Sequence, residues 1–219
     1  SMPYFIDVIL PIPLERLFTY SITQAESEFL KAGMRVAVPF GKSKIYTALV
    51  FEVHQQQPMA YEAKEIHQIL DDAPIITQTQ LTHWQWIAEY YLCTLGDVLR
   101  AALPNSFLLE SETIITKNND KIINDTDLKD EEFLVYEALH HQSSLKLQDL
   151  INILDKKNVF PVINSLLDKD AIVLQEEVYE KYKPKLVRYV KLNGQYSESE
   201  NLQNLLEELS RAPKQRDVI

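Results

Sequence analysis

The hydrophobic pattern of this 219-residue chain changes its period near residue 77. Before that point apolar residues alternate as they do in strands, and after it they recur at helical spacing. The alternation predicts strands at 4–10, 34–40, 44–53 and 64–70, and the helical spacing predicts helices at 78–92 and 95–103. Residues 3–112 should therefore form a small, β-rich α+β domain with two helices. It could be a small barrel or a sheet with helices on one side.

A second pattern follows a polar stretch that contains several asparagines and lysines. Residues 113–128 are therefore predicted to form a linker. From residue 129 the spacing predicts three short helices and then a hairpin, at 130–141, 145–154, 158–167, 171–177 and 185–192. Three helices followed by a hairpin are typical of the winged helix, which we expect over 129–192. Residues 193–219 should be a linker and the start of a further segment, with an amphipathic helix at about 198–209.

Glycine and cysteine usage excludes several functions. The four glycines, at positions 33, 41, 96 and 194, are too far apart for a phosphate-cradling or dinucleotide-binding loop. The one cysteine, Cys93, excludes an intrachain disulfide and a cysteine-clustered zinc site. Histidines and paired acids show no ligand spacing, so we expect no active site and no metal site. No apolar run approaches the ~18 residues of a membrane span.

The net charge of −10 restricts any nucleic-acid binding to a small, shaped site, because most non-specific affinity comes from phosphate neutralisation. One candidate is the second half of the predicted hairpin, where basic residues alternate with aromatic ones. These basic residues are Lys181, Lys183, Lys185 and Arg188. They suit contacts with a DNA backbone, although a solvated strand face would look the same. The helix predicted at 158–167 has no Arg or Gln, which argues against sequence-specific reading of a major groove.

Two turns in the first domain form a second candidate. Residues 16–20 follow a strand that prolines interrupt, and residues 39–42 end another strand. Proline and glycine let a ligand approach the backbone closely, and a nearby aromatic side chain could stack on a base. Ordinary turn chemistry would explain the same residues.

These turns belong to an ordered set of motifs over residues 3–105. The set comprises Pro11-Ile12-Pro13-Leu14, Phe18-Thr19-Tyr20, Gly33-Met34-Arg35-Val36, Val38-Pro39-Phe40-Gly41-Lys42, Lys64, Leu70-Asp71-Asp72-Ala73-Pro74, Trp86-Ile87-Ala88-Glu89-Tyr90-Tyr91, Leu95-Gly96-Asp97-Val98-Leu99 and Ala102-Leu103-Pro104. Their order and spacing resemble the N-terminal domain of the PriA family of replication-restart helicases. Beyond residue 128 the resemblance is one of pattern, and residues 211–215 look like the family's lead-in to its helicase core.

The resemblance implies an N-terminal DNA-binding fragment that recognises stalled or branched forks for primosome assembly. Its first domain would bind the free 3′ end of the nascent leading strand, and its winged helix would contact the parental duplex. The family's 3′-end pocket maps onto Phe18 for stacking, Gly41 for close approach and Lys64 for charge near the terminal phosphodiester. Tyr20 and Lys42 belong to the same two turns and are included in the predicted site.

The predicted pocket departs from the family at one position. Where the family has an acid, this chain has Thr19, whose neutral hydroxyl can accept or donate. A carboxylate would accept a hydrogen bond from a 3′-hydroxyl more strongly. Discrimination for a free 3′-hydroxyl is therefore expected to be weaker here or to depend on the backbone.

The resemblance also implies partners and cofactors. Forked DNA is the expected partner, with single-stranded-DNA-binding protein and other primosome proteins meeting the full-length protein. An ATP-dependent 3′–5′ helicase core, with its ATP, magnesium and zinc, would follow these residues, which themselves should need no cofactor. The expected location is the bacterial cytoplasm, at the nucleoid. Two other functions stay open: a winged-helix transcription regulator, and a protein-interaction module suggested by the acidic balance and the leucines of 202–209.

Overall fold

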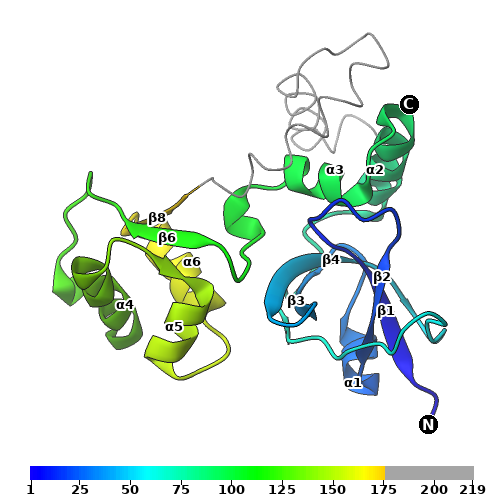
Figure 1. The fold of residues 1–219 in the computed structure, drawn as a ribbon, viewed down its shortest axis with the longest axis horizontal. Helices are drawn as coiled ribbons and strands as arrows, with labels where there is room; N and C mark the ends of the chain where they lie inside the picture. Colours follow the sequence, from blue (N-terminus) through cyan, green and yellow to red (C-terminus); the bar gives the residue numbers. More distant parts are fainter. Residues whose placement is uncertain (176–219) are drawn as a thin grey trace. The chain divides into compact units, whose positions relative to one another are not determined.

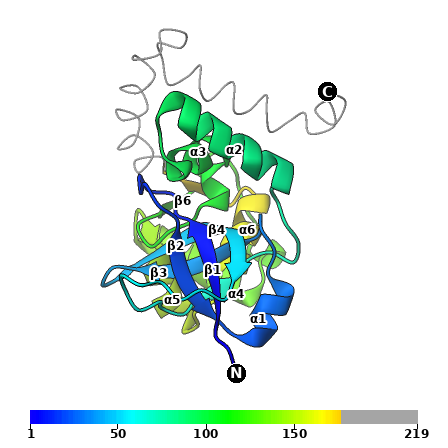
Figure 2. The ribbon, with the colours of Figure 1, turned by 90° about the vertical axis from the view of Figure 1, so that its right-hand side faces the viewer.

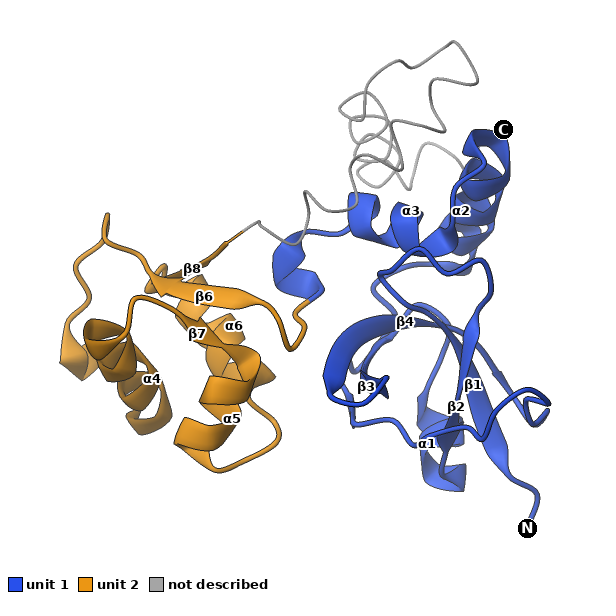
Figure 3. Ribbon diagram, viewed as in Figure 1, with its two compact units in different colours: residues 1–108, 179–219 blue, residues 109–178 orange. Residues whose placement is uncertain are grey.

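The computed structural model describes residues 1–175 (Figure 1). They form two compact units, one within residues 1–108 and one that begins at Leu109 (Figure 3). The strand predicted at 185–192, the helix predicted at 198–209 and the segment 193–219 lie outside the described residues. So do all four basic residues of the predicted hairpin site, Lys181, Lys183, Lys185 and Arg188.

Five strands form an antiparallel sheet in the described part of unit 1, in the order β2-β1-β4-β3-β5. The strands are β1 (Tyr4–Ile9), β2 (Phe18–Ile22), β3 (Arg35–Phe40), β4 (Lys44–His54) and β5 (Gln68–Ile69). β1, β3 and β4 confirm the predicted strands, whereas β2 was expected only as a turn segment. β1 lies between β2 and β4, and its Asp7 is directly opposite Thr19 of β2.

The segment predicted as a strand at 64–70 closes this sheet. At one end the backbone N–H of Ser21 in β2 donates to the Lys64 carbonyl over 2.8 Å, and Ser21 bridges to Glu65. At the other end Gln68 and Ile69 pair with β3 as the short strand β5. Both outer strands are therefore paired with the same segment, and unit 1 is a small barrel rather than an open sheet.

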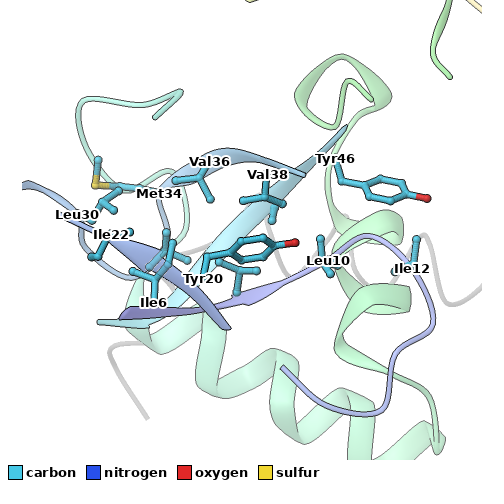
Figure 4. Close-up of a cluster of buried hydrophobic side chains, with 13 residues drawn as sticks. Ile6, Leu10, Ile12, Tyr20, Ile22, Leu30, Met34, Val36, Val38 and Tyr46 are labelled. Carbon is cyan, nitrogen blue, oxygen red and sulfur yellow. The ribbon is translucent and has the colours of Figure 1, made fainter. Parts of the chain in front are cut away.

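Two apolar clusters stabilise unit 1. One fills the barrel and includes Ile6, Tyr20 and Val38 (Figure 4). The other lies between the barrel wall and the helices α2 (Gln78–Tyr91) and α3 (Leu95–Ala102). Figures 1 and 2 show these two helices next to each other above the sheet, with α1 (Gln24–Phe29) at its opposite end.

The three helices described in unit 1 each begin at a threonine. Thr23, Thr77 and Thr94 each accept from a backbone N–H of the first turn, and the acid or amide three residues later bonds back to the threonine N–H. This reciprocal cap explains why α2 and α3 begin where the sequence predicts. Helix α1 was not predicted because it is one and a half turns long and buries no residue fully.

Unit 2 has the element order of a winged helix. It contains β6 (Ile114–Lys117), α4 (Asp130–His141), β7 (Leu145–Lys146), α5 (Leu147–Leu154), α6 (Phe160–Asp168) and β8 (Ile172–Leu174). The three helices confirm those predicted from the spacing. A short 3₁₀ turn lies at Asp125–Asp127 in this unit, and another lies at Asn105–Phe107 at the end of the described part of unit 1.

Residues 113–128, predicted to be a linker, are partly ordered in this sheet. Residues 114–117 form β6, which pairs with both β7 and β8 as the central strand of three. Ile115 is fully buried there. The polar neighbours of β6 hid the strand, because four residues give too short a stretch for an alternation to stand out.

A buried carboxylate joins helices α4 and α6 of unit 2. Glu132 in α4 is 2% exposed and accepts hydrogen bonds from Ser165 Oγ of α6 and from Lys169 Nζ. Burial opposes its ionisation, but the hydrogen bonds from Lys169 and Ser165 hold the pKa of Glu132 below its ordinary value of 4.5. The stabilising effect of the charge is therefore present above pH 4.5 and lost as the pH falls through the lowered value.

Replacing Glu132 with glutamine is expected to reduce the free energy of unfolding of unit 2 by about 2 kcal/mol at pH 7. The deficit should shrink at acid pH, where wild type also loses the charge. Urea denaturation followed by far-UV circular dichroism at pH 7 and at a pH well below 4.5 would measure it. Glu131→Gln is the matched control. The side chains of Lys156 and Glu131 are 38% and 46% exposed, and such exposed pairs contribute about 1 kcal/mol at most. Equal losses in the two variants would contradict the prediction.

Candidate functional site

The predicted site residue Phe18 lies at the start of β2 among three aromatic rings, one from β2 itself and two from other segments. Its ring centroid is 5.3 Å from that of Tyr20, 5.4 Å from that of Phe40 and 4.5 Å from that of Tyr61. The Tyr61 ring is nearly parallel to it, at 8°, so the two rings stack face to face. Tyr61 was not predicted: it comes from the loop after β4, and no periodic pattern marks it.

Gly41 and Lys64 meet beside this cluster, in the turn that follows Phe40. Lys64 Nζ donates to the Gly41 carbonyl over 3.0 Å, although the residues are 23 positions apart. Gly41 has φ +67°, and a Cβ added to it would meet no atom within 4 Å. The turn thus needs glycine for its left-handed backbone and leaves the backbone open to an approaching ligand. Lys42, the next residue, is exposed.

Tyr20 is placed differently from the prediction. Its side chain is fully buried in the barrel, and its hydroxyl donates to the Pro39 carbonyl over 2.6 Å. Burial, and to a smaller degree Tyr61, raises the pKa of this hydroxyl, so it stays protonated. Tyr20 therefore supports the turn before Gly41 and is not available as a surface contact.

Thr19 lies on the opposite face of β2 from the Phe18 and Tyr20 side chains. Its backbone N–H donates to the Tyr61 hydroxyl over 2.8 Å, and its own hydroxyl donates to Asp7 Oδ1 over 2.7 Å. The same Asp7 oxygen lies 2.8 Å from His54 Nε2. His54 Nδ1 accepts from the Gln56 N–H, which leaves the proton of a neutral ring on Nε2, facing Asp7. Neither Asp7 nor His54 was predicted as a site residue, but a lone acid in an otherwise apolar strand was a visible signal for Asp7.

The chain before Phe18 is held by α3. Arg100 Nε donates to the Pro11 carbonyl over 3.0 Å, and Gly96 lies directly against the backbone of Leu10 and Ile12. A Cβ on Gly96 would be 2.0 Å from the Ile12 carbonyl oxygen. Helix α3 therefore fixes the position at which β2 begins, and so it also fixes the position of Phe18.

Cys93 lies in surroundings that suit a structural residue. Burial and the charge of Asp97 raise the pKa of Cys93 to about 12, so its thiol is protonated at neutral pH and is not a nucleophile. Within residues 1–175 no three His, Cys, Asp or Glu side chains are grouped so that they could hold a metal ion. The helices in that range are also too short or too polar to cross a bilayer.

Four lysines of unit 2 are engaged in ion pairs within the unit. Lys121, Lys146, Lys156 and Lys169 pair with Asp170, Glu112, Glu131 and Glu132 respectively. These four charges are therefore partly neutralised by neighbouring carboxylates. The described part of unit 2 thus offers weaker electrostatic attraction for DNA than its lysine content suggests.

The site in unit 1 combines an aromatic cluster, an open glycine turn, a lysine and a hydroxyl bonded to a carboxylate. Such a patch can stack a base, let a sugar approach the backbone and place a positive charge near a phosphate. Together with the winged-helix order of unit 2, it defines the chain as a DNA-binding protein of two domains.

Both domains match models of known protein families. Residues 7–104 match the family model described as the 3′ DNA-binding domain (3′BD) of PriA, and residues 112–177 match a winged-helix domain. The first domain of the chain is therefore a PriA-type 3′ DNA-binding domain, and a winged-helix domain follows it. Nothing in these matches favours a transcription regulator or a protein-interaction module.

Relatives of known name agree with this assignment. The chain is 41% identical over 100 residues to the replication restart protein PriA of Haemophilus influenzae, and 31% over 108 residues to that of Treponema pallidum. It is 26% identical over 227 aligned residues, or 98% of its length, to that of Bacillus subtilis. The chain spans 13%, 16% and 25% of the lengths of these three relatives.

Proposed function

We propose that unit 1 binds the free 3′ end of a DNA strand at a replication fork, through Phe18, Gly41 and Lys64. The observation that supports this most directly is the meeting of these residues, which are up to 46 positions apart in the sequence, at one edge of the barrel. An aromatic ring, an open backbone turn and an ammonium group suit the base, the sugar and the last phosphodiester of one nucleotide. A site for one nucleotide also fits the net charge of −10, because it needs no extended basic surface.

The proposal extends to the longer protein. The chain would be the N-terminal DNA-binding region of an ATP-dependent 3′–5′ helicase that restarts replication at branched DNA in the bacterial cytoplasm. The names of its relatives support this role, as do the two matched domains. ATP, magnesium and zinc would act in the helicase core, and single-stranded-DNA-binding protein and other primosome proteins would be partners of the whole protein.

Removing the ring and the charge together should weaken fork binding. The double variant Phe18→Ala, Lys64→Ala is expected to bind a fork with a free 3′-hydroxyl at its junction about 10-fold to 30-fold less tightly than wild type. Fluorescence anisotropy at two salt concentrations would measure this, because affinity depends strongly on salt.

A matched double variant controls for composition and charge. Phe29→Ala, Lys31→Ala removes an exposed ring and an exposed lysine at the α1 end of unit 1, beyond the far end of β2. It should bind the fork like wild type. Tryptophan fluorescence would verify that both variants are folded, since both tryptophans, Trp84 and Trp86, lie in α2 of unit 1. Equal binding by the two folded double variants would overturn the proposed site.

A further inference from the structure

The sequence of the proposed site has the neutral residue Thr19 at the position where the family has an acid that would bind the 3′-hydroxyl. The structure supplies a carboxylate at the same place from the neighbouring strand. Asp7 of β1 lies directly opposite Thr19 of β2, and its Oδ1 accepts the Thr19 hydroxyl proton over 2.7 Å. The Asp7 side chain is 22% exposed, so its charge acts at the surface of the barrel.

The direction of this hydrogen bond determines what Thr19 can do. A threonine hydroxyl has one proton and two lone pairs, and here the proton is given to Asp7. Toward a ligand, the Thr19 oxygen is therefore an acceptor only. His54 strengthens the arrangement, since its Nε2 lies 2.8 Å from the same Asp7 oxygen and holds the carboxylate in place.

The position next to Thr19 already binds a hydroxyl. The Tyr61 hydroxyl accepts from the Thr19 N–H over 2.8 Å, while the Tyr61 ring covers Phe18. A terminal nucleoside offers the same two groups, a flat ring and a hydroxyl. Thr19 thus offers two groups to one incoming hydroxyl: its backbone N–H as a donor and its side-chain oxygen as an acceptor. The incoming hydroxyl would replace the hydroxyl of Tyr61.

We propose that Asp7 is the specificity-determining residue for a free 3′-hydroxyl: it holds Thr19 as a hydrogen-bond acceptor, and its negative charge disfavours a 3′-phosphate. This inference rests on the proposed function, because it assigns a role within the same 3′-end site. A 3′-hydroxyl can donate to Thr19, whereas a 3′-phosphate is mostly a dianion at neutral pH and then brings only acceptors and two negative charges. Asp7 acts on the DNA through Thr19 and is therefore a positioning residue.

The test measures the affinity for two forks that differ only in the leading strand, which ends in a 3′-hydroxyl or a 3′-phosphate. Wild type should prefer the hydroxyl. Asp7→Asn should bind the hydroxyl fork about 5-fold to 10-fold less tightly and the phosphate fork about 2-fold to 3-fold more tightly. Opposite changes on two ligands identify a specificity role, because loss of structure would weaken both.

Two further variants sharpen the result. Thr19→Val removes the oxygen without changing the shape, so it should also lose most of the preference for the hydroxyl. Glu52→Gln is the matched control: Glu52 lies opposite Asp7 on β4 and is exposed, and its substitution removes the same charge without touching Thr19. It should keep the wild-type preference.

The outcomes separate the two proposals. If wild type does not distinguish the two forks, the proposed 3′-end function fails and the role of Asp7 fails with it. If wild type prefers the hydroxyl and Asp7→Asn keeps that preference, only the role of Asp7 is overturned. Equal weakening of both forks by Asp7→Asn would likewise overturn it.

Discussion

Replacing Asp71 with asparagine is expected to reduce the free energy of unfolding of unit 1 by about 3 kcal/mol. Asp71 accepts from the Arg35 guanidinium through both oxygens, over 2.8 and 3.0 Å, and from the Arg35 backbone N–H over 2.8 Å. The two side chains are only 9% and 14% exposed. Asparagine would remove the charge and turn an NH₂ group toward the guanidinium, so a mostly buried cation would lose its anion.

Urea denaturation followed by tryptophan fluorescence would measure this loss in unit 1 alone, because residues 109–219 contain no tryptophan. In a domain of about 100 residues the expected loss corresponds to a Tm lower by about 12–24 °C. Asp72→Asn is the control, since Asp72 is the exposed neighbour and changes the net charge equally. A loss under 1 kcal/mol in the Asp71 variant, or an equal loss in the control, would show that the pair does not stabilise the unit.

Gly96→Ala should have an effect of similar size, with a different cause. The added Cβ would lie 2.0 Å from the Ile12 carbonyl oxygen and 2.4 Å from that of Leu10, and backbone atoms cannot rotate away. Either α3 or the chain after β1 must move, and we expect the free energy of unfolding to fall by about 3 kcal/mol. The clash exceeds the small gain that alanine brings to a helix over glycine.

This variant also tests how α3 positions the site. Because the chain after β1 leads into Phe18, Gly96→Ala should weaken binding to a 3′-hydroxyl fork even at a temperature where the variant is folded. Ala101→Gly is a suitable comparison, since it changes the glycine content of the same helix at a partly buried position. A stable Gly96→Ala variant with unchanged binding would contradict both the clash and the positioning role.

Several elements could be predicted from short-range patterns. Helices α2 and α3 follow from threonine caps and apolar spacing, and α4, α5 and α6 follow from spacing as well. Strand β6 was missed because it has only four residues, and its place in a sheet depends on β8, more than 50 residues later. Isolated short strands carry little local signal, since their pairing partners determine them.

The residues of the site also divide into those that the sequence indicated and those that only the structure revealed. Phe18, Gly41 and Lys64 were found from ordered motifs in the sequence, whereas Tyr61, Asp7 and His54 were not. Tyr61 lies in an irregular loop. Its ring stacks on Phe18 only because the segment after β4 returns along β2. Asp7 faces Thr19 only because β1 and β2 pair in this register, and a shift of one residue would put Asp7 opposite a core residue.

By itself, the sequence determined the class of each domain, their order along the chain and the motifs that resemble the family. These features depend on the hydrophobic period, the helix caps and the spacing of motifs, which involve residues close together in the chain. The tertiary structure decided that the sheet closes, that Lys64 reaches Gly41, that Tyr20 is internal and that Thr19 donates to Asp7. Each of these depends on strand register and on contacts between distant segments, and no local pattern specifies the direction of a hydrogen bond across a sheet.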